Sequence, residues 1–362
     1  MDRDQRLRSF RIRLLAAFGV GTVPGLLFSG AVEADEQVTE CYVLAEGEDC
    51  LPLAMPNAVL ERLAMEGTES DDGCEEREVI EQVVDGVEPG ECCYTVHVDT
   101  SACSDTDLDL DCGCYGRPYV AEAEVIAAPT VRSSSWGTRA APELRPDLRA
   151  LSPEQRSALA EFWSDNARAE HSSVAGFHRI CLELIAHGAP LELLERSQQA
   201  AADEFAHARI CYALASHYAG EPLGPGPMPI GSAAPIAASL VELAVATARE
   251  GCLAESSAAW LAGELAASAS DPAVRAALEQ IAREEAEHAE LSWMTLRWAI
   301  DVGGDEVREA VAEVFAAARP PMLGGATTSV PAHGMLASAE VQSIVERGFR
   351  ELLVPVMRSL AA

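Results

Sequence analysis

From residue 152 onward, apolar residues recur at the three- and four-residue spacing of amphipathic helices. Ser152 and Pro153 form a helix start, and the "SDP" motif at 270–272 separates two later segments. The pattern predicts helices over about 153–187, 191–219, 236–268 and 272–301. A long connection rich in proline and glycine, "GEPLGPGPMPIGSAAP", joins the second of these helices to the third. Two helical hairpins joined by one long crossover predict a four-helix bundle over residues 152–302.

The chain differs in character on either side of this bundle. Residues 303–362 predict a C-terminal helical extension that packs against the bundle or against a partner subunit, as in a homodimer. Residues 131–151 are rich in Pro, Ser and Arg, which is typical of a linker. Residues 35–130 contain turn motifs, the alternating run "CCYTVHV", which predicts a strand, and "NAVLERLA", which could form a short helix. We therefore expect a mainly α protein with a small domain ahead of its helices.

The N-terminus has the features of a secretory signal peptide in their usual order. Five arginines between Arg3 and Arg13 precede the apolar run "LLAAFGVGTVPGLLF", and small residues follow in "SGAVEA". This order predicts a signal peptide over residues 1–34, cleaved after Ala31 or Ala34, and an exported protein that is periplasmic, at the cell surface or secreted. The alternative is an uncleaved membrane anchor, although glycine and proline interrupt the apolar run. We expect no stable membrane span after cleavage.

Cysteine is concentrated in the small domain, where eight of the eleven cysteines lie between Cys41 and Cys114. An even number of cysteines behind an export signal predicts a disulfide-pinned domain of up to about four bridges, whose connectivity the spacing does not determine. A thiolate metal site at the Cys92-Cys93 pair and "CGC" at 112–114 is the alternative. The absence of a C-x-x-C spacing disfavours it.

The charge balance excludes one class of partner. The chain has 58 acidic and 26 basic residues, and therefore a formal net charge of −32. Nucleic acid requires a basic surface to neutralise its phosphates, so no nucleic acid is expected among the partners.

Two Glu-x-x-His motifs supply candidate metal ligands within the bundle. Glu204 and His207 lie in "ADEFAHAR", and Glu285 and His288 lie in "REEAEHAE". Residues three apart on a helix lie on the same face, so each pair can reach one point. The acids that precede Glu204 and Glu285, namely Asp203 and Glu284, are expected to face solvent, as is Glu287.

A glutamate on each of the other two helices completes the pattern. Glu170 precedes Glu204 by 34 positions, and Glu250 precedes Glu285 by 35. The two halves repeat, because Glu170 and Glu250 are separated by 80 positions and the two motifs by 81. Counting outward from the "SDP" turn instead favours Glu255 on the third helix. We choose Glu250 as the metal ligand and keep Glu255 as the alternative.

These motifs resemble those of the ferritin-like di-iron proteins, whose bundles include rubrerythrin and bacterioferritin. The series "AEHSSVAGF … DEFAHARICYALAS … REGCLAES … EAEHAELSW" is similar to exported ferritin-like proteins of GC-rich bacteria. The resemblance covers residues 153–302 and implies two iron ions bridged by Glu204 and Glu285. It implies that the terminal ligands are Glu170, His207, Glu250 and His288.

The resemblance also implies a reaction with dioxygen or peroxide, hence an oxidase or oxygenase whose substrate and electron donor the sequence does not identify. Carboxylates and imidazoles also suit manganese or another divalent metal. One alternative function is a non-catalytic module that binds or sequesters metal. Another is a metal-free helical scaffold that presents the Cys-rich domain.

Overall fold

The computed structural model describes residues 3–17, 36–43, 50, 76–83, 91–99, 116–121, 124–136, 144–230, 236–320 and 328–359. Contacts between Cα atoms divide the chain into two units. The smaller consists of residues Leu26–Asp107, and the larger of Met1–Gly25 together with Leu108–Ala362. The protein is mainly helical, as the sequence predicts.

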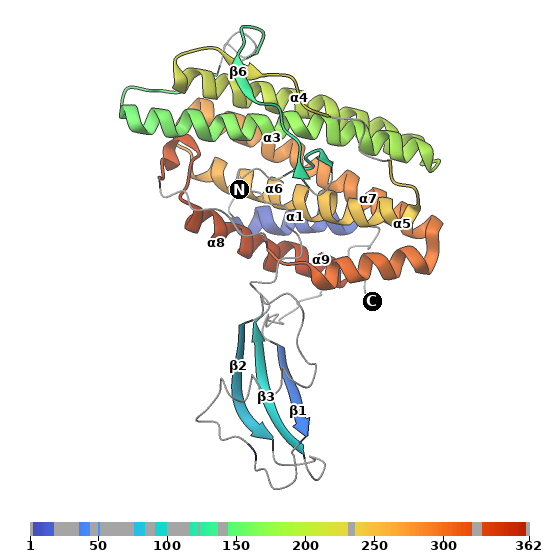
Figure 1. Cartoon of the computed structure of the whole chain (residues 1–362). Helices are drawn as coiled ribbons and strands as arrows, with labels where there is room; N and C mark the ends of the chain where they lie inside the picture. The colour runs from blue at the N-terminus through green and yellow to red at the C-terminus, as the bar shows by residue number, and fades with distance from the viewer. Residues whose placement is uncertain are drawn as a thin grey trace. The chain divides into compact units, whose positions relative to one another are not determined.

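The smaller unit contains a three-stranded antiparallel sheet in the order β1-β3-β2 (Figure 1). Its strands are β1 (Glu36–Val43), β2 (Glu76–Val83) and β3 (Glu91–Asp99). The alternating run "CCYTVHV" lies in β3, so this strand prediction is confirmed. A disulfide joins Cys50 to Cys92 of β3, which is consistent with an oxidising environment. The predicted helix "NAVLERLA" and the cysteines of "CGC" lie outside the described residues.

The chain joins the larger unit earlier than the sequence analysis expects. The described residues of 116–136, which we call the strap, lie on the helices rather than in the small domain. Within it, β4 (Val120–Ala121) pairs with β5 (Glu124–Val125), and β6 (Thr130–Arg132) pairs with β7 (Leu223–Pro225). The Tyr119 N–H donates to Ser172 Oγ at 2.9 Å, and that hydroxyl donates to the Ile126 carbonyl at 2.6 Å. These bonds place the boundary before residue 116 rather than near 130.

The first helical hairpin consists of α3 (Pro153–Ala186) and α4 (Leu191–Ala219), which lie side by side in Figure 1. Helix α3 begins with a capping box, in which Ser152 Oγ accepts from the Gln155 N–H and the Gln155 side chain accepts from the Ser152 N–H. Helix α4 ends at Gly220, whose φ of 73° is the left-handed conformation that glycine adopts readily. Local sequence signals therefore set both ends of the hairpin.

The second hairpin contains an irregularity that the sequence analysis did not anticipate. Its first arm is α5 (Leu240–Ala246), the π-helix η2 (Thr247–Glu255) and α6 (Ser256–Ser268), and its second arm is α7 (Pro272–Ala317). Asp271 caps α7 by accepting from two backbone N–H groups. Gly304, with φ 68°, interrupts α7 where the sequence predicts the end of one helix and the start of another. A π-helical segment inside α-helix is frequently found at a functional site.

The remaining helices pack on this hairpin (Figure 1). They are η3 (Pro331–His333), α8 (Ser338–Gly348), the π-helix η4 (Phe349–Leu353), α9 (Val354–Arg358) and α1 (Arg3–Ala17). Helix α1 contacts α7, and Arg6 and Arg13 form ion pairs with Glu264 and Glu290.

The predicted cleavage positions and most of the apolar run behind α1 lie outside the described residues, so the signal peptide stays a prediction. Among the described helices, none combines the length and apolarity required to cross a bilayer.

Candidate metal centre

Four helical segments bring a group of acids and histidines together inside the larger unit. They supply Glu170 from α3, Glu204 and His207 from α4, Glu255 from the end of η2, and Glu285 and His288 from α7. Each Glu-x-x-His motif lies within a regular α-helix, so its two side chains share one face. The site therefore lies between the two hairpins, as the sequence predicts.

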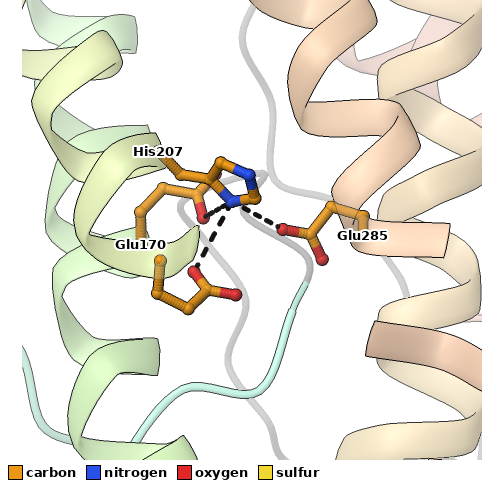
Figure 2. Close-up of side chains that lie close together, drawn as sticks. Glu170, His207 and Glu285 are labelled. Carbon is orange, nitrogen blue, oxygen red and sulfur yellow. Dashed lines mark ion pairs between the residues drawn. The ribbon is translucent and has the colours of Figure 1, made fainter. Parts of the chain in front are cut away.

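The first half of the site is arranged around the Nδ1 atom of His207. This atom lies 3.5 Å from Glu170 Oε2, 3.8 Å from Glu204 Oε2 and 3.1 Å from Glu285 Oε1. In Figure 2, the carboxylates of Glu170 and Glu285 both point toward the imidazole of His207, with Glu285 approaching from the right of the view. One ligand atom from each of these four residues lies within 4.8 Å of the others, a spacing that could hold a metal ion.

The second half is arranged in the same way around His288. Its Nδ1 atom lies 3.1 Å from Glu204 Oε1 and 3.7 Å from Glu285 Oε2. Glu255 joins these residues, and the four ligand atoms again lie within 4.8 Å of one another. The two imidazole rings are 5.8 Å apart between centroids. The site thus has two adjacent positions, each with one histidine.

Glu204 and Glu285 belong to both halves. Glu204 directs Oε2 toward His207 and Oε1 toward His288, whereas Glu285 directs Oε1 toward His207 and Oε2 toward His288. Glu170 serves only the His207 half, and Glu255 only the His288 half. A carboxylate that offers one oxygen to each of two positions is arranged to bridge two cations.

The inner atoms of the site are buried and have no hydrogen-bond partner among the described residues. Glu204, His207 and Glu255 are 0% exposed, and Glu285 and His288 are 1% and 2% exposed. The unpartnered atoms are both carboxylate oxygens of Glu204, Glu255 and Glu285, and Nδ1 of His207 and His288. Buried polar atoms are normally paired, so this arrangement fits residues that coordinate a cation.

The outer nitrogen of each histidine is held by an acid from the opposite motif. His207 Nε2 lies 2.9 Å from Glu284 Oε2, and His288 Nε2 lies 3.4 Å from Asp203 Oδ2. The prediction that Asp203 and Glu284 face solvent is therefore wrong, because each leans across to the neighbouring helix. The signal in the sequence was the acid that precedes the glutamate in both motifs. Such a bond fixes the imidazole orientation and leaves Nδ1 free to bind metal.

Glu250, our first choice on the third helix, does not join the site, whereas the alternative Glu255 does. The Glu250 carboxylate instead forms an ion pair with Arg179 of α3. Glu250 lies five positions before Glu255, the spacing of one π-helical hydrogen-bonded turn in η2. Aligning "TARE" with "ARAE" therefore selects a glutamate that lies outside the cluster. The count outward from the "SDP" turn selects Glu255, which lies in the cluster.

Burial and mutual repulsion control the protonation of the acids. Burial raises the pKa of Glu170 and of Glu255 well above the usual range. Burial would also raise the pKa of Glu285, but interactions with His207 and His288 outweigh it and hold that pKa below the usual value. For both histidines, burial opposes the charged form, yet the surrounding acids raise the pKa well above its usual value. Without metal the cluster therefore retains protons, and an entering cation must displace them.

No protein-family model, curated protein or solved structure matches this chain. The resemblance to ferritin-like proteins therefore stays a prediction from the motifs. The geometry of the described residues supports a coarser conclusion, namely that a buried cluster of glutamates and histidines could hold metal.

Proposed function

We propose that this protein binds a dinuclear metal centre inside a ferritin-like four-helix bundle and uses it for oxidation. The arrangement of Glu204 and Glu285, each with one oxygen toward His207 and one toward His288, carries the proposal. Glu170 and Glu255 would be the terminal carboxylates, one at each metal. This ligand set, with two Glu-x-x-His motifs and two further glutamates, is the one that ferritin-like di-metal bundles use.

Iron is the metal we propose, and manganese is the main alternative. Carboxylate and imidazole ligands suit both metals, and the site contains no thiolate among its ligand groups. Four carboxylates balance the charge of two divalent ions, so the loaded site can lie in an apolar interior. When bound, two iron ions would supply the oxidation of a substrate by dioxygen or peroxide.

The residues of the chain would position these ions and keep water away from them. Asp203 and Glu284 hold the outer nitrogens of His288 and His207, which directs both Nδ1 atoms inward. Glu170 is the least buried of the six, since its side chain is 13% exposed. Of these ligands, Glu170 is therefore the one nearest to solvent. We propose an exported protein, for which the Cys50–Cys92 disulfide is consistent support.

Elemental analysis of the full chain tests the metal centre. The wild type should carry about two irons per chain after anaerobic ferrous loading, and a variant with Glu204→Ala and His207→Ala should carry none. Glu287→Ala is the matched control, because Glu287 lies in the same motif as Glu285 but is exposed. Equal metal content in all three proteins, or none in the wild type, would contradict the proposal.

Oxidant consumption separates an enzyme from a sequestration module. A loaded oxidase should consume dioxygen or peroxide over many turnovers in the presence of a reductant, whereas a sequestration module should stop after the bound iron is oxidised. The Glu204→Ala and His207→Ala variant gives the background rate for both measurements.

A further inference from the structure

A small cavity lies in the larger unit beside the metal centre. It has a volume of about 10 Å³, which is room for one water-sized particle. Residues from α3, α4, α7 and the strap line it, and they include Arg117, Phe177, Ile180, Leu291, Ser292 and Thr295. Its walls are thus mostly apolar, with one guanidinium and a few hydroxyl groups.

The cavity adjoins the His288 half of the centre. The Phe177 ring, which forms one wall, lies 4.9 Å from the His288 ring between centroids. Ser292 follows His288 by one helical turn, and its Oγ donates to the His288 carbonyl at 3.0 Å. The cavity is therefore one turn of α7 away from a ligand of the proposed centre.

Arg117 is the charged residue of this cavity, and it is only 2% exposed. Its guanidinium lies over the Phe177 ring, 5.7 Å from the centroid, and Nη2 reaches Ser292 Oγ at 3.4 Å. Its Nε is buried and has no hydrogen-bond partner among the described residues. No ion pair within the described part of the chain includes Arg117. A buried guanidinium with so little compensation is costly unless an anion accompanies it.

Two glycines make room for this arginine. A Cβ on Gly176 of α3 would overlap the Arg117 carbonyl oxygen, and a Cβ on Gly251 of η2 would overlap Arg117 Nη2. Arg117 of the strap therefore lies between three helical segments, and the glycines of α3 and η2 leave the space that it occupies. This is more consistent with a specific buried position than with a surface arginine that has folded inward.

The nearest charged groups are already engaged with one another. The positive charge of Arg117 favours the ionised form of Glu250, so the two groups lie near each other. The Glu250 carboxylate nevertheless forms its ion pair with Arg179. Glu183 lies 3.8 Å from Arg179 Nε and accepts from the Ala237 N–H at 3.1 Å. Two arginines and two glutamates thus form a neutral group, in which Arg117 is the member without a direct carboxylate contact.

We propose that Arg117, Ser292 and Thr295 form a binding site for a small monovalent anion of about the size of chloride. The guanidinium would provide the charge and its unpartnered Nε–H. The Thr295 hydroxyl, together with the Ser292 hydroxyl once it turns away from the His288 carbonyl, would complete the donor set. The size of the cavity excludes larger oxyanions and organic acids. This site does not depend on the proposed metal centre, so it can be tested on metal-free protein.

Thermal unfolding of the full metal-free chain, titrated with sodium chloride or with sodium gluconate at equal ionic strength, tests the site. Gluconate is too large for the cavity, so it controls for general salt effects. In the wild type, chloride should raise the unfolding temperature in a saturable way and gluconate should not. Arg117→Met should weaken the apparent chloride affinity at least about tenfold, whereas the exposed Arg297→Met on α7 should leave it unchanged.

A comparison in buffer without chloride provides a second test of the anion site. In chloride-free buffer, the unfolding temperature of Arg117→Met should lie closer to that of the wild type than it does in saturating chloride, because only the wild type gains the bound anion. If Arg117→Met does not fold, Ser292→Ala replaces it and should weaken chloride binding about fivefold. Equal responses to chloride and gluconate in the wild type would overturn the proposal. So would a chloride response that survives in Arg117→Met, or a difference in unfolding temperature between the two proteins that chloride leaves unchanged.

Discussion

Glu204 and Glu285 each divide their two oxygens between two histidines, which is the arrangement expected of the proposed two-metal site rather than of two separate ion pairs. Five of the six residues of this cluster are those that the sequence predicts, because helical spacing alone places each motif on one face. It could not show that Asp203 and Glu284 lean inward. A helical pattern gives the direction in which a side chain leaves its own helix, but not what the adjacent helix offers it.

Removing one terminal carboxylate should remove one metal. Glu255→Ala is expected to bind about one iron per chain, because Glu255 belongs only to the His288 half. Glu250→Gln should still bind two, since Glu250 pairs with Arg179 outside the cluster. Elemental analysis after ferrous loading measures both variants. The reverse result would restore Glu250 as the ligand of the third helix.

Asp203 and Glu284, which contact the histidines, should affect the affinity for metal but not the number of metal ions bound. Asp203→Asn and Glu284→Gln keep the size of each side chain but replace the carboxylate that contacts His288 or His207. Each should weaken metal binding by about 10- to 100-fold while the number of sites stays at two. Competition with a chelator of known affinity provides the measurement. An unchanged affinity in both variants would show that these contacts are incidental.

At the scale of elements, capping residues and turns predicted where the helices begin and end. No sequence pattern predicted the π-helix η2. Ser152, Asp271 and Gly220 mark helix ends in the sequence as clearly as in the structure. In an Ala-rich segment, however, hydrophobic periodicity does not distinguish an α-helical turn from a π-helical one. The cluster contains Glu255, at the C-terminal end of η2, whereas Glu250 pairs with Arg179. The strap was missed for another reason, since its strands β4, β5 and β6 are only two or three residues long and leave no alternating pattern.

The ion pair between Arg179 and Glu250 should contribute to the stability of the helical unit. Arg179 joins α3 to η2 through Glu250 and to the strap through the Val120 carbonyl, which it approaches at 2.9 Å. Arg179→Met should lower the free energy of unfolding by about 3 kcal/mol, because it leaves a buried carboxylate without its nearest cation. Chemical denaturation followed by helical circular dichroism measures this loss. The double variant with Glu250→Leu should recover most of it, and no recovery would argue against the pair.

At the scale of the whole molecule, we expect that a change in one unit can be made without affecting the other. The disulfide lies in the β-sheet unit, and the metal ligands all lie in the helical unit. Cys50→Ser should lower the stability of the sheet unit by about 2–4 kcal/mol. Metal content per chain should remain that of the wild type. A loss of metal in Cys50→Ser would show that the sheet unit contributes to the centre.

The central claim, two metals bridged by Glu204 and Glu285, is tested most directly by anomalous diffraction from crystals of the iron-loaded full chain. We expect two iron peaks about 3.5–4 Å apart, one beside His207 Nδ1 and the other beside His288 Nδ1. Both should contact Glu204 and Glu285, with Glu170 and Glu255 as the outer carboxylates. A single peak, peaks beside Glu250, or no iron between the hairpins would contradict it.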